Sequence, residues 1–131
     1  MPTTIAIRDE TTSGTSLREF MLEFLTERIT VRELIRSRVY QEVQDYNRNQ
    51  TEVYQGLVRP TDAEETLNGY RLKKPRTLDW EKQFEKALEA FEATRVLVLV
   101  DDRQVESLDE EIVLTPETQA TFLRLVPLVG G

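Results

Sequence analysis

Hydrophobic and polar residues alternate near the start of the chain. In residues 4–10, TIAIRDE, the large apolar residues Ile5 and Ile7 are two positions apart, which is the period of a β-strand with one buried face. Residues 11–16 are rich in threonine and serine and include Gly14, which favours a turn. Residues 17–25 are again rich in apolar positions, and because they follow a turn we interpret them as a strand. The pattern predicts an N-terminal β-hairpin.

The period changes to that of an α-helix after residue 29. Thr30 is a typical N-cap, Glu33 completes a capping box, and Ile29 and Leu34 are placed to form a hydrophobic staple. Apolar side chains then recur at helical spacing, at Val31, Leu34, Ile35, Val39, Val43 and Tyr46. This stripe predicts a helix that ends near Asn47.

Residues 48–94 have no continuous period, and we expect a partly ordered insertion packed on the edge of the core. Residues 61–65 are interpreted as one short helical turn. Asp79 is placed to cap a second helix with an apolar stripe of Trp80, Phe84, Ala87, Leu88 and Phe91. This stripe is expected to be core, and the alternative is a docking groove or a dimer face built from the insertion.

The last third of the chain returns to β-structure. Residues 96–100, VLVLV, are typical of a strand in the middle of a sheet, and residues 101–102 predict a turn into a brief pairing at 104–105. Leu108 and Ile112 are assigned to an acidic connection, and residues 121–126 predict a final strand. The order of elements predicts an α+β layer pair in which the hairpin and the final strand share a sheet beneath the first helix.

We expect one domain over residues 1–131. Its core is expected at about residues 3–47 and 95–126, with the insertion at about 48–94 and a flexible tail at 127–131.

Composition narrows the classes of function. The chain of 131 residues has a net charge of −7 and no run of basic residues, which argues against nucleic-acid binding. It contains no cysteine and no histidine, which excludes disulfides, thiol nucleophiles, imidazole bases and Cys/His metal sites. The start of the chain does not resemble a signal peptide, and no apolar run is long enough to cross a bilayer. We therefore expect a cytoplasmic protein that binds no membrane and no metal.

The C-terminal third resembles ubiquitin-like proteins. Residues 98–105, VLVDDRQV, are similar to the third strand, turn and short fourth strand of that family, and residues 107–109 to the segment that follows. Residues 122–126, FLRLV, stand where the last strand of ubiquitin precedes its Gly-Gly. The end, LVPLVGG at 125–131, is more similar to the sulfur carriers, such as the small subunit of molybdopterin synthase. The resemblance implies a β-grasp fold, a mixed sheet with one packed helix, to which the insertion with its second helix is added.

The resemblance also implies a role for the terminal glycines. In this family a separate activating enzyme uses ATP to adenylate the terminal carboxylate, which here is expected to be that of Gly131, preceded by Gly130. A Gly-Gly end has no Cβ atoms and can enter a narrow channel of such an enzyme. The tail lacks the arginines of ubiquitin, so we expect the activating enzyme to recognise Pro127, Leu128 and Val129.

The expected function is that of a protein modifier in a bacterial ubiquitin-like conjugation system, joined to target amines by an isopeptide bond. The chain itself is expected not to be an enzyme and to bind no cofactor. Expected partners are an activating enzyme, a conjugating enzyme, a deconjugating protease and target proteins, with a partner surface at Leu99, Arg103, Phe122 and Arg124. Two alternatives stay open: a sulfur carrier with a C-terminal thiocarboxylate for cofactor biosynthesis, and a β-grasp adaptor that is not conjugated. The insertion favours the modifier, because sulfur carriers are usually minimal.

Two charged clusters are interpreted as solvated. One is a helix face formed by Arg28, Arg32, Arg36 and Arg38, with a partner site as the alternative. The other is the acidic loop at residues 109–111, with a contact for a basic activating enzyme as the alternative.

Overall fold

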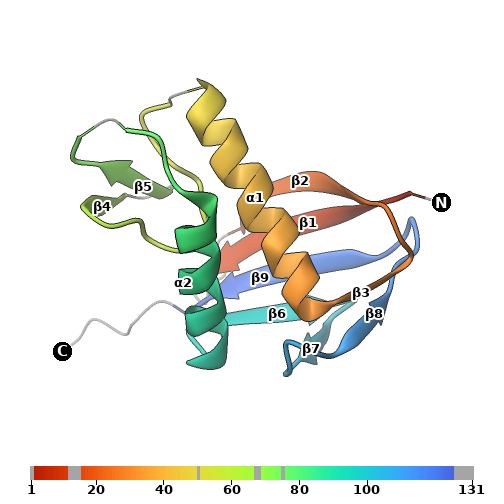
Figure 1. The fold of residues 1–131 in the computed structure, drawn as a ribbon. Coiled ribbons are helices and arrows are strands. Elements are labelled where there is room, and N and C mark those ends of the chain that lie inside the picture. The colour runs from red at the N-terminus through yellow and green to blue at the C-terminus, as the bar shows by residue number, and fades with distance from the viewer. Residues whose placement is uncertain (1, 12–15, 50, 67–68, 75, 126–131) are drawn as a thin grey trace.

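A mixed sheet of five strands with two helices on one of its faces forms the body of the computed structural model (Figure 1). The structure describes residues 2–11, 16–49, 51–66, 69–74 and 76–125. The predicted α+β class is confirmed. The elements in chain order are β1 (Thr3–Thr11), β2 (Ser16–Phe24), β3 (Arg28–Thr30), α1 (Val31–Asn49), β4 (Ala63–Thr66), β5 (Gly69–Leu72), α2 (Trp80–Glu92), β6 (Val96–Val100), β7 (Arg103–Val105), β8 (Glu111–Val113) and β9 (Gln119–Arg124).

The predicted N-terminal hairpin is confirmed. Strands β1 and β2 pair antiparallel, with Ile5 opposite Leu22. Ile5 and Ile7 are fully buried, whereas Thr4, the residue next to Ile5 on the same strand, is exposed. The alternation in the sequence therefore places one face of the hairpin against the core. The predicted turn at Gly14 lies outside the described residues.

Strand β9 occupies the centre of the large sheet. The strand order is β2-β1-β9-β6-β7, in which β1 and β9 run parallel and the other neighbours run antiparallel. The parallel pairing places Ile7 of the first strand against Ala120 of the last. Val98 and Phe122 lie opposite each other and have no exposed surface, as expected for strands in the middle of a sheet.

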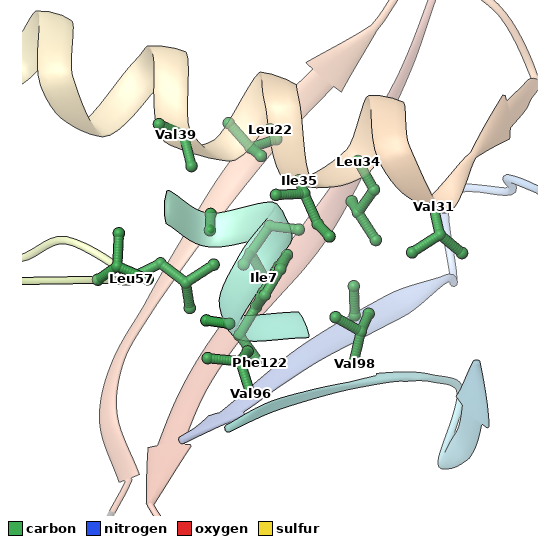
Figure 2. Close-up of a cluster of buried hydrophobic side chains, with 14 of the residues drawn as sticks. Ile7, Leu22, Val31, Leu34, Ile35, Val39, Leu57, Val96, Val98 and Phe122 are labelled. Carbon is green, nitrogen blue, oxygen red and sulfur yellow. The ribbon is translucent and has the colours of Figure 1, made fainter. Parts of the chain in front are cut away.

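The first helix, α1, begins where its capping box predicts. The backbone N–H of Glu33 donates to Oγ1 of Thr30 at 3.2 Å, which satisfies one of the unpaired donors at the helix start. Figure 2 shows Leu34 and Ile35 on the side of α1 that faces the sheet. The whole predicted stripe is buried, namely Val31, Leu34, Ile35, Val39, Val43 and Tyr46.

The second helix, α2, packs beside α1 and against β6 (Figure 1). Oδ1 of Asp79 accepts from the backbone N–H of Glu81 at 3.0 Å, which confirms the predicted cap. The ring of Trp80 meets that of Tyr40 on α1 edge to face, with centroids 5.3 Å apart. The remaining large residues of the stripe are half-buried against the core, as expected: Phe84, Leu88 and Phe91.

The insertion contains a hairpin where a helical turn was expected. Strand β4 pairs antiparallel with β5, and Thr66 lies opposite Gly69, whose φ of +155° favours glycine. The prediction of a helical turn at residues 61–65 is therefore wrong. The insertion also supplies buried side chains to the hydrophobic cluster: Tyr54, Leu57, Val58, Tyr70, Leu72 and Leu78. It is thus part of the core and not only an addition at its edge.

Strands β3 and β8 form a separate two-stranded sheet that the sequence did not reveal. Ile112, assigned to an acidic connection, lies opposite Ile29, and both are buried. Each strand has only three residues, too few for an alternating pattern to be recognised.

Candidate interaction surface

The predicted activation site belongs to the tail that follows β9. The last described residue is Leu125, which is 39% exposed and whose backbone N–H donates to the carbonyl of Arg95 at 3.0 Å. The chain therefore leaves the sheet beside the connection between α2 and β6. The residues predicted for activation and tail recognition lie outside the described residues: Pro127, Leu128, Val129, Gly130 and Gly131.

The predicted partner surface contains one clear error, at Phe122. This side chain has no exposed surface and lies opposite Val98 in the core (Figure 2). Side chains alternate between the two faces of a strand, so Phe122 points toward the helices while Thr121 and Leu123 point to the opposite face. Phe122 therefore cannot contact a partner while the protein is folded.

Leu99 lies on the face of the sheet that the helices leave uncovered. It is half-buried and sits opposite Thr121, and the next outward pair on the same two strands is Leu97 with Leu123. Directly opposed residues share a face, so these four side chains form one surface, which we call the open-face patch. Met21 on β2 has the same orientation and is 59% exposed.

The predicted partner surface names Leu99 but not Leu97 and Leu123, which lie on the same face of the sheet. The signal was present in the run VLVLV at residues 96–100. Once Val98 is assigned to the core, the leucines on either side of it must face outward.

Arg124 and Arg103 do not join the open-face patch. Arg124 lies opposite Val96 on the helix-covered face, where its Nη1 donates to the hydroxyl of Tyr70 at 2.9 Å. Arg103 is exposed at the start of β7, and its Nη1 pairs with Glu110 at 2.7 Å. The four residues predicted as one surface are thus divided among different parts of the molecule.

An ionic cluster is buried where α1, β1 and the insertion meet. Arg38 is 1% exposed and donates two hydrogen bonds to the carboxylate of Asp9, while its Nε donates to Oε2 of Glu42 at 3.0 Å. The other oxygen of Glu42 accepts from the hydroxyl of Tyr54 and from the N–H of Leu57, both at 3.1 Å. The prediction that Arg38 belongs to a solvated helix face is therefore wrong. An arginine can be buried when carboxylates pair with its charge.

The environment shifts the pKa values within this cluster. Burial alone would lower the pKa of Arg38, but the attraction of Asp9 and Glu42 outweighs it, so its pKa is raised and the guanidinium stays charged. Burial raises the pKa of Glu42, and its interactions with Arg38 and the N–H of Leu57 offset only part of that effect. Because Glu42 binds two groups of the insertion, the cluster fixes the insertion to α1.

The other three arginines of the predicted helix face lie at the surface, as predicted, and two of them pair with the acidic loop. Arg28 pairs with Glu111 at 3.6 Å and Arg32 with Asp109 at 3.3 Å, while Arg36 is exposed beside the ring of Trp80. Exposed pairs of this kind contribute little to stability.

No helix among the described residues is long and apolar enough to cross a membrane. The same residues include no group of three acidic side chains arranged to hold a metal ion. Comparisons of the chain with protein-family models, with curated proteins and with solved structures gave no match.

Proposed function

We propose that the chain is a ubiquitin-like protein modifier with a β-grasp fold, in which the carboxylate of Gly131 is adenylated by a partner enzyme and then joined to amines of target proteins in the cytoplasm. The observation that carries the proposal is the position of β9. This strand pairs parallel with β1 and antiparallel with β6, and it ends at Arg124, shortly before the Gly-Gly. A hairpin and a final strand that share one sheet beneath α1 agree with the arrangement that the resemblance implies.

The chemistry needs catalytic groups that this chain lacks. A carboxylate is anionic at neutral pH and a poor electrophile, so it must first be activated. ATP converts it to an acyl-adenylate with release of pyrophosphate, and an enzyme thiolate then displaces AMP to form a thioester. A target amine displaces the thiolate, which gives the isopeptide bond and regenerates the enzyme thiol. The chain contains no cysteine, so we assign the thiol to a partner enzyme.

The open-face patch supports recognition by such partners. Its centre is apolar at Leu97, Leu99 and Leu123, while Arg8 and Glu19 on the same face form an exposed ion pair at 2.9 Å. An apolar centre with a charged rim is the usual anatomy of a protein interface. We therefore assign the open-face patch, in place of the surface that included Phe122, to the contact with enzymes of the conjugation system.

Mass spectrometry of the N-terminally tagged protein from its native host tests the proposal. Trypsin cleaves after Arg124, so a conjugated target should carry residues 125–131 as a branch on a lysine. Deletion of Gly131 is the matched control and should abolish the branch. The intact mass of the same sample shows whether Gly131 is the terminal residue of the mature protein.

Two other outcomes would contradict the modifier. Unattached protein in which sulfur replaces one oxygen of the terminal carboxylate would identify a sulfur carrier. An unmodified end with no adduct, under conditions in which the host expresses the protein, would favour the adaptor.

A further inference from the structure

A cavity of about 400 Å³ lies where β9 ends, between the sheet, α2 and the part of the insertion that precedes α2. We call it the β9-end pocket. Its volume is within the range of sites for small molecules. Six charged side chains line it, namely Arg59, Lys86, Arg95, Arg124, Glu65 and Glu89.

Among the described residues, the cations of the β9-end pocket have no acidic partner. Within the part of the chain that the structure describes, none of the four forms an ion pair, although two carboxylates line the same cavity. Two of them are instead held by neutral oxygens: Nζ of Lys86 donates to Oγ1 of Thr61 and Nη1 of Arg124 to the hydroxyl of Tyr70, both at 2.9 Å. Arg59 and Arg95 are exposed residues, and their guanidinium groups have no such partner among the described residues.

The charge of the pocket opposes that of the whole chain. Four cations and two carboxylates leave an excess of two positive charges, in a protein whose net charge is −7. A phosphate monoester carries a charge of about −1.5 to −2 at pH 7, which matches this excess. Arginine also offers a planar fork of donors that fits phosphate oxygens.

The pocket has an apolar wall beside these charges. Leu57 and Val58 of the insertion and Val96 of β6 line it together with the cations. Small-molecule sites commonly combine such a wall with a few polar groups that fix the orientation of the ligand. An inorganic anion would leave this wall uncovered, whereas an organic ester would cover it.

We propose that the β9-end pocket binds a small organic phosphate monoester, with the phosphoryl group near Arg59, Arg95 and Arg124 and the organic part against the apolar wall. Eight of its thirteen lining residues, among them Arg59, Leu57 and Val58, come from the insertion, which has no counterpart in the family that the chain resembles. The proposal does not depend on conjugation of the tail.

Phenyl phosphate is a suitable probe, with phenol and inorganic phosphate as comparisons. Each is titrated into the full chain and followed by two-dimensional amide NMR. We expect saturable shifts from phenyl phosphate at amides that line the pocket, such as those of Val58, Val96 and Leu125. Inorganic phosphate should bind more weakly at the same amides, and phenol should not bind there.

Matched variants identify the groups responsible. The double variant Arg59→Gln/Arg95→Gln removes two exposed cations from the pocket and should weaken phenyl phosphate binding by about tenfold or more. The control Arg48→Gln/Lys82→Gln removes the same charge from exposed positions outside the pocket and should change binding by less than about twofold. Glu89→Gln increases the excess of positive charge and should strengthen binding.

Three results would overturn the proposal: no saturable shift at millimolar phenyl phosphate, equal weakening by the two double variants, or equal binding of phenol. The amide spectra of the variants themselves show whether each is folded.

Discussion

Replacement of Arg38 by methionine would test the buried ionic cluster. The substitution keeps much of the apolar volume but removes the hydrogen bonds to Asp9 and Glu42, which are only 7% and 4% exposed. Two carboxylates would then be buried without their main cation. Loss of one partner of a buried pair costs about 3–5 kcal/mol. With an unfolding entropy of about 2.1 cal/mol/K per residue, the melting temperature should fall by about 10–18 °C.

Urea denaturation measures this loss, followed by circular dichroism and by the fluorescence of Trp80, the single tryptophan. Arg48→Met is the matched control, because Arg48 lies on the same helix but is exposed, and its loss should be below about 0.5 kcal/mol. If Arg38→Met were no more destabilising than Arg48→Met, the reasoning from burial would be refuted.

A triple variant separates lost charge pairing from lost packing. In Asp9→Asn/Arg38→Met/Glu42→Gln both uncompensated carboxylates are removed, although Arg18 loses its 3.9 Å ion pair with Asp9. An amide oxygen at position 42 can still accept from Tyr54 and Leu57. The triple variant should be more stable than Arg38→Met alone. A triple variant less stable than the single one would show that packing, not charge, dominates at this site.

Because burial raises the pKa of Glu42, the folded state binds more protons than the unfolded state between the ordinary and the raised pKa. The contribution of Glu42 to the free energy of unfolding should therefore be complete at pH values below its ordinary pKa and should decline as pH rises through the raised pKa. Urea titrations at a series of pH values should show that the stability of Glu42→Gln depends less on pH than that of the unchanged protein. Phe122→Ala should lower the free energy of unfolding by about 3–5 kcal/mol in the same denaturation assay, because the side chain is fully buried. Leu99→Ala on the open face should lower it by less than about half as much. Equal losses would contradict the assignment of the two faces. If copies of the chain are joined to each other, peptide mapping should find the branch on the exposed residue Lys82 in preference to Lys86, which is half-buried and whose ammonium donates a hydrogen bond to Thr61. A branch mainly on Lys86 would argue against this reasoning.

Most of the fold follows from signals that act over a few residues. The N-terminal alternation and the caps at Thr30 and Asp79 each involve neighbours in the sequence, and the structure has the corresponding elements where they were predicted. The hairpin at β4 and β5 could not be predicted in this way, because a polar strand such as Ala63–Thr66 is specified by its pairing partner and not by its own pattern.

The burial of Arg38 depends on residues distant in the sequence, yet part of the signal was local. Arg38 and Glu42 follow Leu34 at intervals of one helical turn, which places both on the buried stripe that continues to Tyr46. Their polarity concealed this position, and the compensating charge of Asp9 lies on β1. The resemblance predicts that Leu99 lies in a partner surface, and this stays a prediction, whereas the face on which Phe122 lies depends on its register with Val98.

The central position of β9 has a consequence for synthesis of the protein. A ribosome completes β1 and β6 before β9, so each of these strands has an unpaired edge until residues 119–124 emerge. Such edges make an incomplete chain prone to aggregation and a substrate for chaperones. Pairing between the first and last strands is also non-local, which favours slow folding. The five-stranded sheet can therefore be completed only after translation has reached β9. A chain whose synthesis stops earlier lacks both the complete sheet and the residues that follow β9.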